Sequence, residues 1–474
     1  MNTTLILASL PLLVLAAASL VVMLAIAVHR SHLLTLLLTL AGLAAAFVSI
    51  WAAAPLAPTP LAGLLEIDRY SLFYIGLIVA SAAAVAVLAY PYLEQHDDHR
   101  EELYILLLLA TSGCAVLVSS IHFVSFLLGL EILSISLYGM VAYLTGRPQA
   151  LEAGIKYLIL ASASAAFLLF GMALIYADTG SMAFSRVAEP PPGGSSLALL
   201  LPGIALTVTG IGFKLGVVPF HLWTPDVYQG APAPVTAFVA TTSKTAMVAL
   251  LLRYLPASAL QNDAVYSVFA VVAVASMCAG NLMALRQSNV KRILAYSSIA
   301  HFGYILVAFL SGAAAAVNAV SLYLVAYTVT TLAAFGIVTV LSGPQADADS
   351  LDVYRGLFWR RPALAAVFTV VLLSLAGIPA TVGFLGKFYI LAAGASAAAW
   401  TLMLVLVLTS VAGLFYYLRI VVALYAAPPE QAVATPAVAW SGACLLGVLA
   451  IVVIWAGVYP SPLLNLIRAA VSAP

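Results

Sequence analysis

Apolar residues follow one another in long tracts along almost the whole chain, and short segments rich in polar residues, proline and glycine separate them. Tracts of about 20 residues match the length that an α-helix needs to cross a bilayer. We therefore predict an all-α polytopic membrane protein with about fourteen transmembrane helices. The predicted spans are residues 3–28, 33–54, 70–93, 102–119, 121–144, 150–177, 197–222, 233–256, 264–285, 291–311, 314–342, 362–393, 398–425 and 437–459.

Two of the predicted spans, the seventh and the twelfth, are interrupted. The prolines at these interruptions are Pro219, Pro225, Pro232, Pro234 and Pro379. Broken helices leave backbone groups unpaired, which a membrane tolerates only beside a cavity or packed protein. Paired interruptions in two halves of a chain indicate the inverted repeats of transporters. We predict that helices 4–8 (101–257) and helices 9–13 (258–425) form two inverted five-helix repeats, flanked by helices 1–3 (1–100) and helix 14 (426–474).

Composition supports the membrane interpretation and excludes several classes of protein. Only 7% of the 474 residues are charged and mean hydropathy is +1.14, whereas soluble domains carry roughly 25% charged residues. A net charge of +1 argues against binding of nucleic acid. The cysteines lack ligand spacing, and we find no nucleotide or metal motif. We therefore expect no metal and no redox cofactor on this chain. The longest loops, near 178–196 and 343–361, are too short for a soluble domain, and the Pro/Gly run at 190–194 is expected to be a solvated linker.

Loop charges predict an orientation. When the loops are assigned alternately to the two sides, one side holds ten basic residues and the other holds four. The richer side is expected to be cytoplasmic, which places both termini on the outer side. The ten residues are Arg30, Arg100, Arg147, Arg286, Lys291, Arg292, Arg355, Arg360, Arg361 and Arg419. The first residues lack the basic region of a signal peptide, so we expect the first tract to be a retained helix.

The lysines are the most informative residues. The chain has five, and four of them, Lys156, Lys214, Lys244 and Lys387, fall within apolar tracts, while the loops use arginine almost exclusively. Burial of an ionised side chain costs at least about 2.5–3.5 kcal/mol. Lysine, unlike arginine, can lose its proton when it is desolvated. These positions therefore predict buried amines that are suited to moving protons.

Two acidic residues accompany the lysines. Glu131 lies roughly 13 Å into the fifth span, and Ser134 and Tyr138 extend a polar stripe from it. A carboxylate locked to a lysine for structural reasons is the alternative for Glu131. Glu152 precedes Lys156 by four residues and is expected to modulate Lys214, although a purely structural pair is also consistent with this spacing.

Other polar residues recur at helical spacing in the second half. Ser297, His301 and Tyr304 lie on one face of the tenth span, and Tyr323 and Tyr327 on one face of the eleventh. They are candidates for a proton relay that includes water, and a packed core histidine is the alternative for His301.

His221, beside the first interruption, is a further candidate, expected to link Lys214 to Lys244. The alternative is a hydrogen bond with a structural role, from the His221 ring to the backbone at the helix interruption.

Several of these segments, spread over residues 60–425, resemble the antiporter-like membrane subunits of respiratory complex I. The similar segments are residues 131–138, 152–157, 210–244, 286–304 and 375–389. Within this family, residues 219–238 (PFHLWTPDVYQGAPAPVTAF) and the lysine at position 387 are most similar to one branch of the complex I subunits. The presence of all fourteen spans resembles the bacterial form.

The resemblance implies a function and a setting. Glu131, Lys214, Lys244 and Lys387 match the family's proton-channel charges, and Glu152 and Lys156 match its modulating pair. The implied protein is a proton-translocating subunit of a NADH:quinone oxidoreductase in a bacterial inner membrane, with other antiporter-like subunits as partners. FMN, iron–sulfur clusters and quinone are then expected on other subunits. Ferredoxin and reduced deazaflavin are alternative electron donors.

Two other functions are also consistent with the sequence. One is an Mrp-type cation/proton antiporter subunit, and the other is a passive scaffold whose buried charges form structural pairs.

Overall fold

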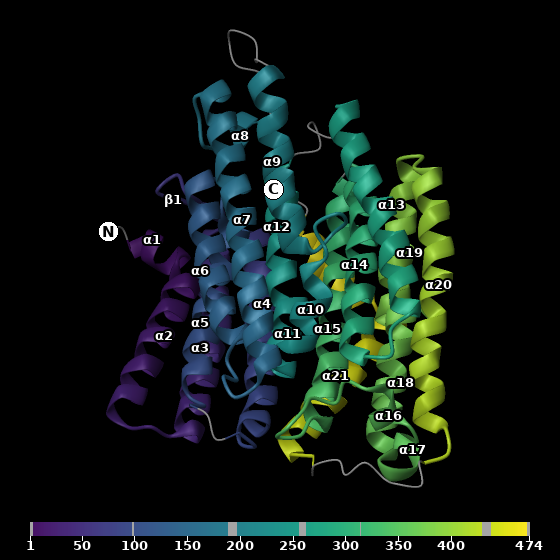
Figure 1. Cartoon of the computed structure of the whole chain (residues 1–474). Coiled ribbons are helices and arrows are strands. Elements are labelled where there is room, and N and C mark those ends of the chain that lie inside the picture. The colour runs from purple at the N-terminus through teal and green to yellow at the C-terminus, as the bar shows by residue number, and fades with distance from the viewer. Residues whose placement is uncertain are drawn as a thin grey trace.

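The protein is a bundle of long helices that run side by side (Figure 1). The computed structural model describes residues 3–96, 99–187, 197–255, 262–312, 314–428 and 438–471. Within these ranges, thirteen helices are long and apolar enough to cross a membrane. They are α2 (Leu10–Val28), α3 (His32–Ala53), α4 (Arg69–Leu93), α5 (Glu102–Ser119), α6 (Phe123–Val141), α7 (Pro148–Thr179), α9 (Leu197–Leu215), the pair α11 (Ala233–Ala240) and α12 (Thr242–Tyr254), α13 (Asp263–Leu285), α14 (Val290–Phe309), α15 (Ala314–Leu341), α20 (Trp400–Tyr425) and α21 (Trp440–Val458).

The twelfth predicted span consists of two shorter helices, α18 (Pro362–Ala376) and α19 (Val382–Ser396). Together with the thirteen longer ones they agree with the prediction of about fourteen spans, and the all-α membrane architecture is confirmed. The arrangement as two inverted repeats, and the side of the membrane that each terminus faces, stay predictions.

Both predicted interruptions are present. The helix α9 ends at Leu215, and Gly216 follows with φ of +70° before the short helix α10 (Trp223–Gly230). The helix α18 ends at Ala376, and Gly377 follows with φ of +88°. L-residues with a side chain avoid this left-handed conformation, so glycine permits the chain to leave each helix abruptly.

A third break, between α11 and α12, was not predicted. It lies at Thr241, where the hydroxyls of Thr241 and Ser243 donate to the carbonyl oxygens of Ala237 and Val239. Such bonds from side chains compete with the regular helical ladder.

Several short elements were also not predicted. They are α1 (Thr3–Ala8), η1 (Ala54–Leu56), the antiparallel strands β1 (Thr59–Leu61) and β2 (Leu65–Ile67), α8 (Phe184–Val187), α16 (Leu351–Tyr354), α17 (Leu357–Arg360) and α22 (Ser461–Val471). The predicted linker at 190–194 lies outside the described residues.

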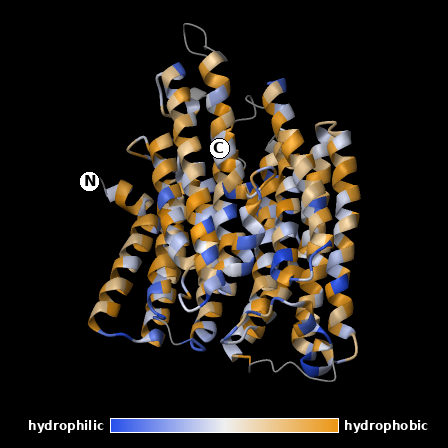
Figure 2. Ribbon diagram, viewed as in Figure 1, coloured by the Kyte–Doolittle hydropathy of each residue, from blue (hydrophilic) through white to orange (hydrophobic). Residues whose placement is uncertain are grey.

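The helices that carry the candidate residues lie inside the bundle. The most apolar stretches of α14 and of the α11–α12 pair are 94% buried, whereas those of α20 and α21 are 28% buried. Figure 2 shows hydrophobic residues along most of the outer helices α2 and α20, with hydrophilic residues in the loops at the lower end. Polar groups on the inner helices are therefore shielded by the protein itself, as required of intramembrane polar residues.

Candidate functional site

Three lysines lie in the interior, each close to a helix break. Lys214 is 5% exposed in the last turn of α9, Lys244 is fully buried in the first turn of α12, and Lys387 is 8% exposed in α19. Broken helices supply the unpaired backbone groups that such side chains require. One example is the carbonyl oxygen of Ala376, which accepts a hydrogen bond of 2.8 Å from the Lys387 Nζ.

Lys214 is held by hydroxyl groups from two neighbouring helices. Its Nζ donates to the Ser134 Oγ in α6 at 2.8 Å and to the Tyr157 hydroxyl in α7 at 3.0 Å. Glu131 lies one turn before Ser134, but among the described residues it forms no direct ion pair with Lys214. Glu131 is partly buried in this chain.

Lys244 lies among aromatic rings and has one hydroxyl partner. Its Nζ donates to the Ser298 Oγ at 3.0 Å and lies 4.8 Å from the ring centroid of Phe302, 5.4 Å from that of Tyr228 and 5.9 Å from that of Trp223. The negative faces of such rings attract a cation. The ring faces would therefore favour the protonated amine, to which no carboxylate binds among the described residues.

The helix α10 separates Lys214 from Lys244. The Trp223 indole in α10 donates to the carbonyl oxygen of Phe213 at 2.8 Å, and its ring centroid lies 5.0 Å from that of Tyr157. A Cβ at Gly216 would lie 2.5 Å from the Thr224 Oγ1 and 3.2 Å from the Lys244 Nζ. The absence of a side chain at Gly216 therefore allows the end of α9 to approach the central lysine.

A series of polar side chains runs from Lys244 toward Lys387. The Tyr327 hydroxyl donates to the same Ser298 Oγ at 2.8 Å. Tyr327 and Lys387 both line a small cavity of about 10 Å³, together with His301. This volume is close to the minimum that one water molecule needs. The Lys387 Nζ also donates a hydrogen bond of 2.8 Å to the Ser410 Oγ in α20.

His301 joins the two predicted polar stripes. Its Nδ1 is 2.8 Å from the Tyr323 hydroxyl and its Nε2 is 3.0 Å from the Tyr417 hydroxyl, and Tyr417 also bonds to Ser297. Tyr304 packs against this series of side chains: its ring centroid lies 5.5 Å from that of His301 and 5.4 Å from the Lys387 Nζ. Its hydroxyl accepts a hydrogen bond from Asn281 at 3.0 Å.

His221 is partly buried in the turn before α10, and its Nδ1 has no partner among the described residues. The predicted link from His221 to Lys214 and Lys244 is therefore not formed by hydrogen bonds there. Of the prolines, Pro219 lies in that turn, Pro225 in α10, Pro232 and Pro234 at the start of α11, and Pro379 between α18 and α19.

The lysines fall into two groups by their partners. Among the described residues, Lys214, Lys244 and Lys387 bond only to hydroxyl and carbonyl oxygens. Lys156 and Lys291 each bind a carboxylate. A hydroxyl group either accepts from an ammonium or donates to a neutral amine, so the three deep lysines have partners suited to both protonation states.

The Glu152–Lys156 pair forms at 2.7 Å, but it lies at the surface of this chain. The side chain of Lys156 is 44% exposed and that of Glu152 is 65% exposed. The prediction that Lys156 is buried was wrong, because the residue lies in the early turns of α7 on an outward face. Lys156 also contacts Asp226 of α10 at 3.1 Å, beside a cavity of about 180 Å³.

Asp226 connects this surface pair to the interior helices. Arg292 of α14 also binds it, at 2.8 Å. Partial burial alone would raise the pKa of the Asp226 carboxyl, but Arg292 and Lys156 bring that pKa below its usual value. The carboxylate therefore remains charged and holds α10 between α7 and α14.

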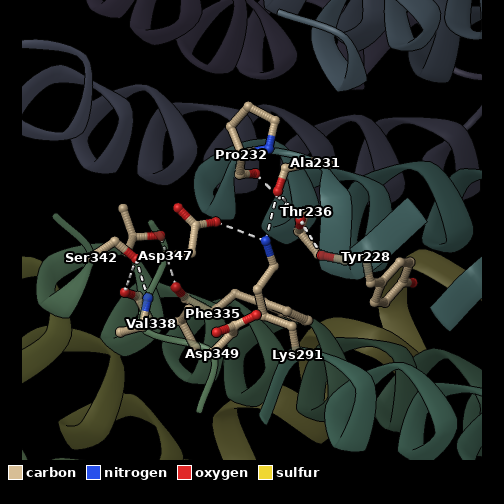
Figure 3. A network of polar contacts seen from close by, with 12 residues as sticks. Tyr228, Ala231, Pro232, Thr236, Lys291, Phe335, Val338, Ser342, Asp347 and Asp349 are labelled. Carbon is tan, nitrogen blue, oxygen red and sulfur yellow. Dashed lines mark hydrogen bonds and ion pairs between the residues drawn. The ribbon is translucent and has the colours of Figure 1, made fainter. Parts of the chain in front are cut away.

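Lys291 was predicted as a loop charge, and this was wrong. It is fully buried at the start of α14, where its Nζ donates to Asp347 at 2.7 Å and to the carbonyl oxygen of Ala231 at 2.6 Å (Figure 3). Arg147 binds the other oxygen of Asp347 at 2.9 Å. Burial would raise the pKa of Asp347, but Lys291 and Arg147 lower it. This cluster ties the two halves of the chain together.

Comparisons with known proteins agree with this geometry. Residues 120–413 match a family model described as "NADH:quinone oxidoreductase/Mrp antiporter, TM". A curated relative from Ectopseudomonas mendocina, named NADH-quinone oxidoreductase subunit N, is 48% identical over 97% of this chain and 95% of its own length.

Solved structures give the same result. A chain of respiratory complex I from Thermus thermophilus is 33% identical, with a TM-score of 0.83 over 96% of this chain and 98% of its own. A chain of the Mrp complex from Dietzia, at 20% identity and a TM-score of 0.87, covers 100% of this chain and 97% of its own. A chain of an archaeal sulfane sulfur reductase, at 23% identity and a TM-score of 0.83, covers 98% and 97%. The last two show a shared fold only.

Proposed function

The chain belongs to the NADH:quinone oxidoreductase/Mrp antiporter family, and on this basis we propose that protons cross it along a line of interior amines formed by Lys214, Lys244 and Lys387. Its similarity to an N subunit identifies the branch that residues 219–238 predicted, and makes it an antiporter-like proton-pumping membrane subunit of complex I. In the proposed relay, Glu131 acts on the first lysine, and the Glu152–Lys156 pair modulates it from the surface.

One observation carries the proposal: the three deep lysines have neutral partners. A lysine bound to a carboxylate releases its proton only at the cost of leaving the carboxylate unpaired. Lys214, Lys244 and Lys387 have hydroxyl partners instead, and these accept or donate a hydrogen bond as the amine gains or loses its proton.

The groups between the amines support a path along which a proton could move in either direction. Ser298 touches both Lys244 and Tyr327, and the small cavity beside Tyr327 reaches Lys387. Between Lys214 and Lys244 the chain places Trp223 and Thr224 of α10. A change in the separation of Glu131 and Lys214 would alter the affinity of Lys214 for its proton and so start the transfer.

The energies are of comparable size. Moving one charge against 100 mV costs about 2.3 kcal/mol, and one hydrogen bond to a charged group contributes about 1.5–3 kcal/mol. The free energy of one such contact at Lys214 is therefore comparable to the work of moving one proton across the membrane.

The setting follows from the named relatives. The curated relative is a subunit of a NADH-quinone oxidoreductase, so we propose NADH as the electron donor and quinone as the acceptor of the assembled complex. We propose that FMN and iron–sulfur clusters reside on other subunits of that complex. The partners are other membrane subunits of the complex, in a bacterial inner membrane.

Substitution of the central lysine tests the proposal. In the assembled complex, reconstituted in vesicles free of sodium and potassium, Lys244→Ala and Lys244→Arg should abolish electron-driven proton uptake, because the first lacks the amine and the second does not release its proton. The control, Arg468→Gln, changes an exposed basic residue of α22 and should pump normally. Normal pumping by an assembled Lys244→Ala complex would refute the relay, and a requirement for sodium would favour cation antiport.

A further inference from the structure

A large apolar groove lies on the outer surface of the bundle, away from the lysines. Its volume is about 700 Å³, and its walls come from α3, α4, α15 and α22. Two of its lining residues, Trp51 and Leu466, are 64% and 57% exposed, so other helices of the described chain leave the groove open. In a membrane, such a surface is covered by lipid or by another protein.

The groove has one basic residue at its end. Arg69, the first residue of α4, lines the groove and is exposed. It has no acidic partner among the described residues, although its neighbour Asp68 binds Arg253 at 2.8 Å. Trp51 lies in the same groove, and tryptophan is enriched at the level of lipid headgroups. A guanidinium that has no carboxylate partner among the described residues, in the same groove as such a tryptophan, is suited to a phosphate group.

The length of the groove matches an acyl chain. Its lining follows α4 from Arg69 to Ala80, which is about 16 Å at 1.5 Å per residue. One leaflet of hydrocarbon is about 15 Å deep. Small residues, among them Gly76 and Ala80, leave room along this line.

The helix α22 closes the other side of the groove. It presents Leu463, Leu466 and Ala470 to the groove, while Arg468 is exposed. A helix with one apolar and one polar face is typical of the boundary between hydrocarbon and headgroups. The basic end of the groove and the polar face of α22 are therefore both consistent with headgroup depth.

We propose that this groove binds a glycerophospholipid, with its phosphate at Arg69 and an acyl chain along Leu72, Gly76 and Ala80. The ligand is identified by the Arg69 guanidinium at one end and by the purely apolar lining that extends one leaflet from it. The proposal does not depend on the proton relay.

Photolabelling of the assembled complex tests the site. The complex is placed in nanodiscs of phosphatidylethanolamine and phosphatidylglycerol that contain a trace of phosphatidylcholine with a diazirine at the end of its acyl chain. After illumination, labelled peptides are identified by mass spectrometry. In the unaltered complex, label should concentrate on the peptides that carry residues 72–80, along which the acyl chain runs.

Three variants distinguish the outcomes. Ala80→Trp fills the groove and should lower labelling of these peptides about tenfold, while Arg69→Gln should lower it about twofold or more through loss of an exposed charge contact. Ile451→Trp, at a 66% exposed position of α21, should leave it unchanged. If the Ala80→Trp complex does not assemble, labelling of the complex with the conservative surface change Arg69→Gln still tests the proposal. Equal labelling of Arg69→Gln and the unaltered complex, or protection of the groove by a neighbouring subunit, would overturn the proposal.

Discussion

Replacement of Ser134 by alanine isolates one contact of Lys214, the first lysine of the proposed relay. The Ser134 Oγ is 2.8 Å from the Lys214 Nζ, and the side chain is 3% exposed. A hydrogen bond to a charged group contributes about 1.5–3 kcal/mol, which corresponds to about a 10- to 100-fold change in an equilibrium. Ser134→Ala should therefore reduce the equilibrium constant for protonation of Lys214 by about that factor and slow proton translocation.

The helix itself provides a matched control. Ser136 lies two residues later in α6 and is also 3% exposed, but its hydroxyl donates only to the carbonyl oxygen of Ile132, at 2.7 Å. Ser136→Ala removes an equal volume from the same helix without touching the lysine. Ser134→Thr, which keeps the hydroxyl, should restore most of the rate, since a β-branched residue costs only a few tenths of a kcal/mol in a helix.

The assay compares variants in assembled complexes. Complexes that contain equal amounts of this subunit are reconstituted in vesicles, and internal acidification is followed with a quenched fluorescent dye after addition of electron donor and quinone. The reasoning fails if Ser134→Ala and Ser136→Ala acidify the vesicles at the same rate. It also fails if Ser134→Thr pumps no better than Ser134→Ala.

Two further predictions concern stability. Asp347→Asn leaves Lys291 and Arg147 without their carboxylate and should cost about 3–5 kcal/mol. The pKa of Asp347 is lowered in the fold, so its contribution is present above the unfolded value of about 3.9 and is lost as pH falls through the folded one. Melting curves should accordingly show a constant deficit from pH 8 to 5, and a deficit that instead grows on acidification would contradict this. Gly216→Ala should lower the melting temperature and slow pumping. Alanine at φ of +70° costs about 1–2 kcal/mol, and its Cβ would collide with Thr224. The control is Gly146→Ala, because a Cβ at position 146 meets nothing within 4 Å.

The sequence predicted the deep lysines because a charge inside an apolar tract contrasts with everything around it. Lys214, Lys244 and Lys387 are all in the interior. The same rule misplaced Lys156, because position along an apolar tract does not reveal which face of the helix carries a residue. It also missed Lys291, whose polar neighbours in sequence resemble a loop although its side chain points into the protein.

The partners of the lysines could not be predicted in the same way. Ser298 lies next to the predicted Ser297, and helical spacing alone does not decide which of two adjacent serines faces Lys244. Ser410 and Tyr417 belong to α20, far along the chain, and only packing brings them to Lys387 and His301. The run Thr241–Thr242–Ser243 was a local signal for the unpredicted helix break, since the hydroxyls of Thr241 and Ser243 bond to the backbone.

The stability of the fold does not explain the three deep lysines. At about 2.5–3.5 kcal/mol each on insertion scales, three ionised amines cost roughly 8–10 kcal/mol, as much as the net stability of many domains. Carboxylate partners would offset part of this cost, as Asp347 does for Lys291, yet no carboxylate binds Lys214, Lys244 or Lys387 within the described ranges. A scaffold would be more stable with methionine at these positions. We propose instead that the arrangement serves proton transfer, because an amine among hydroxyl groups keeps hydrogen-bond partners in both of its protonation states.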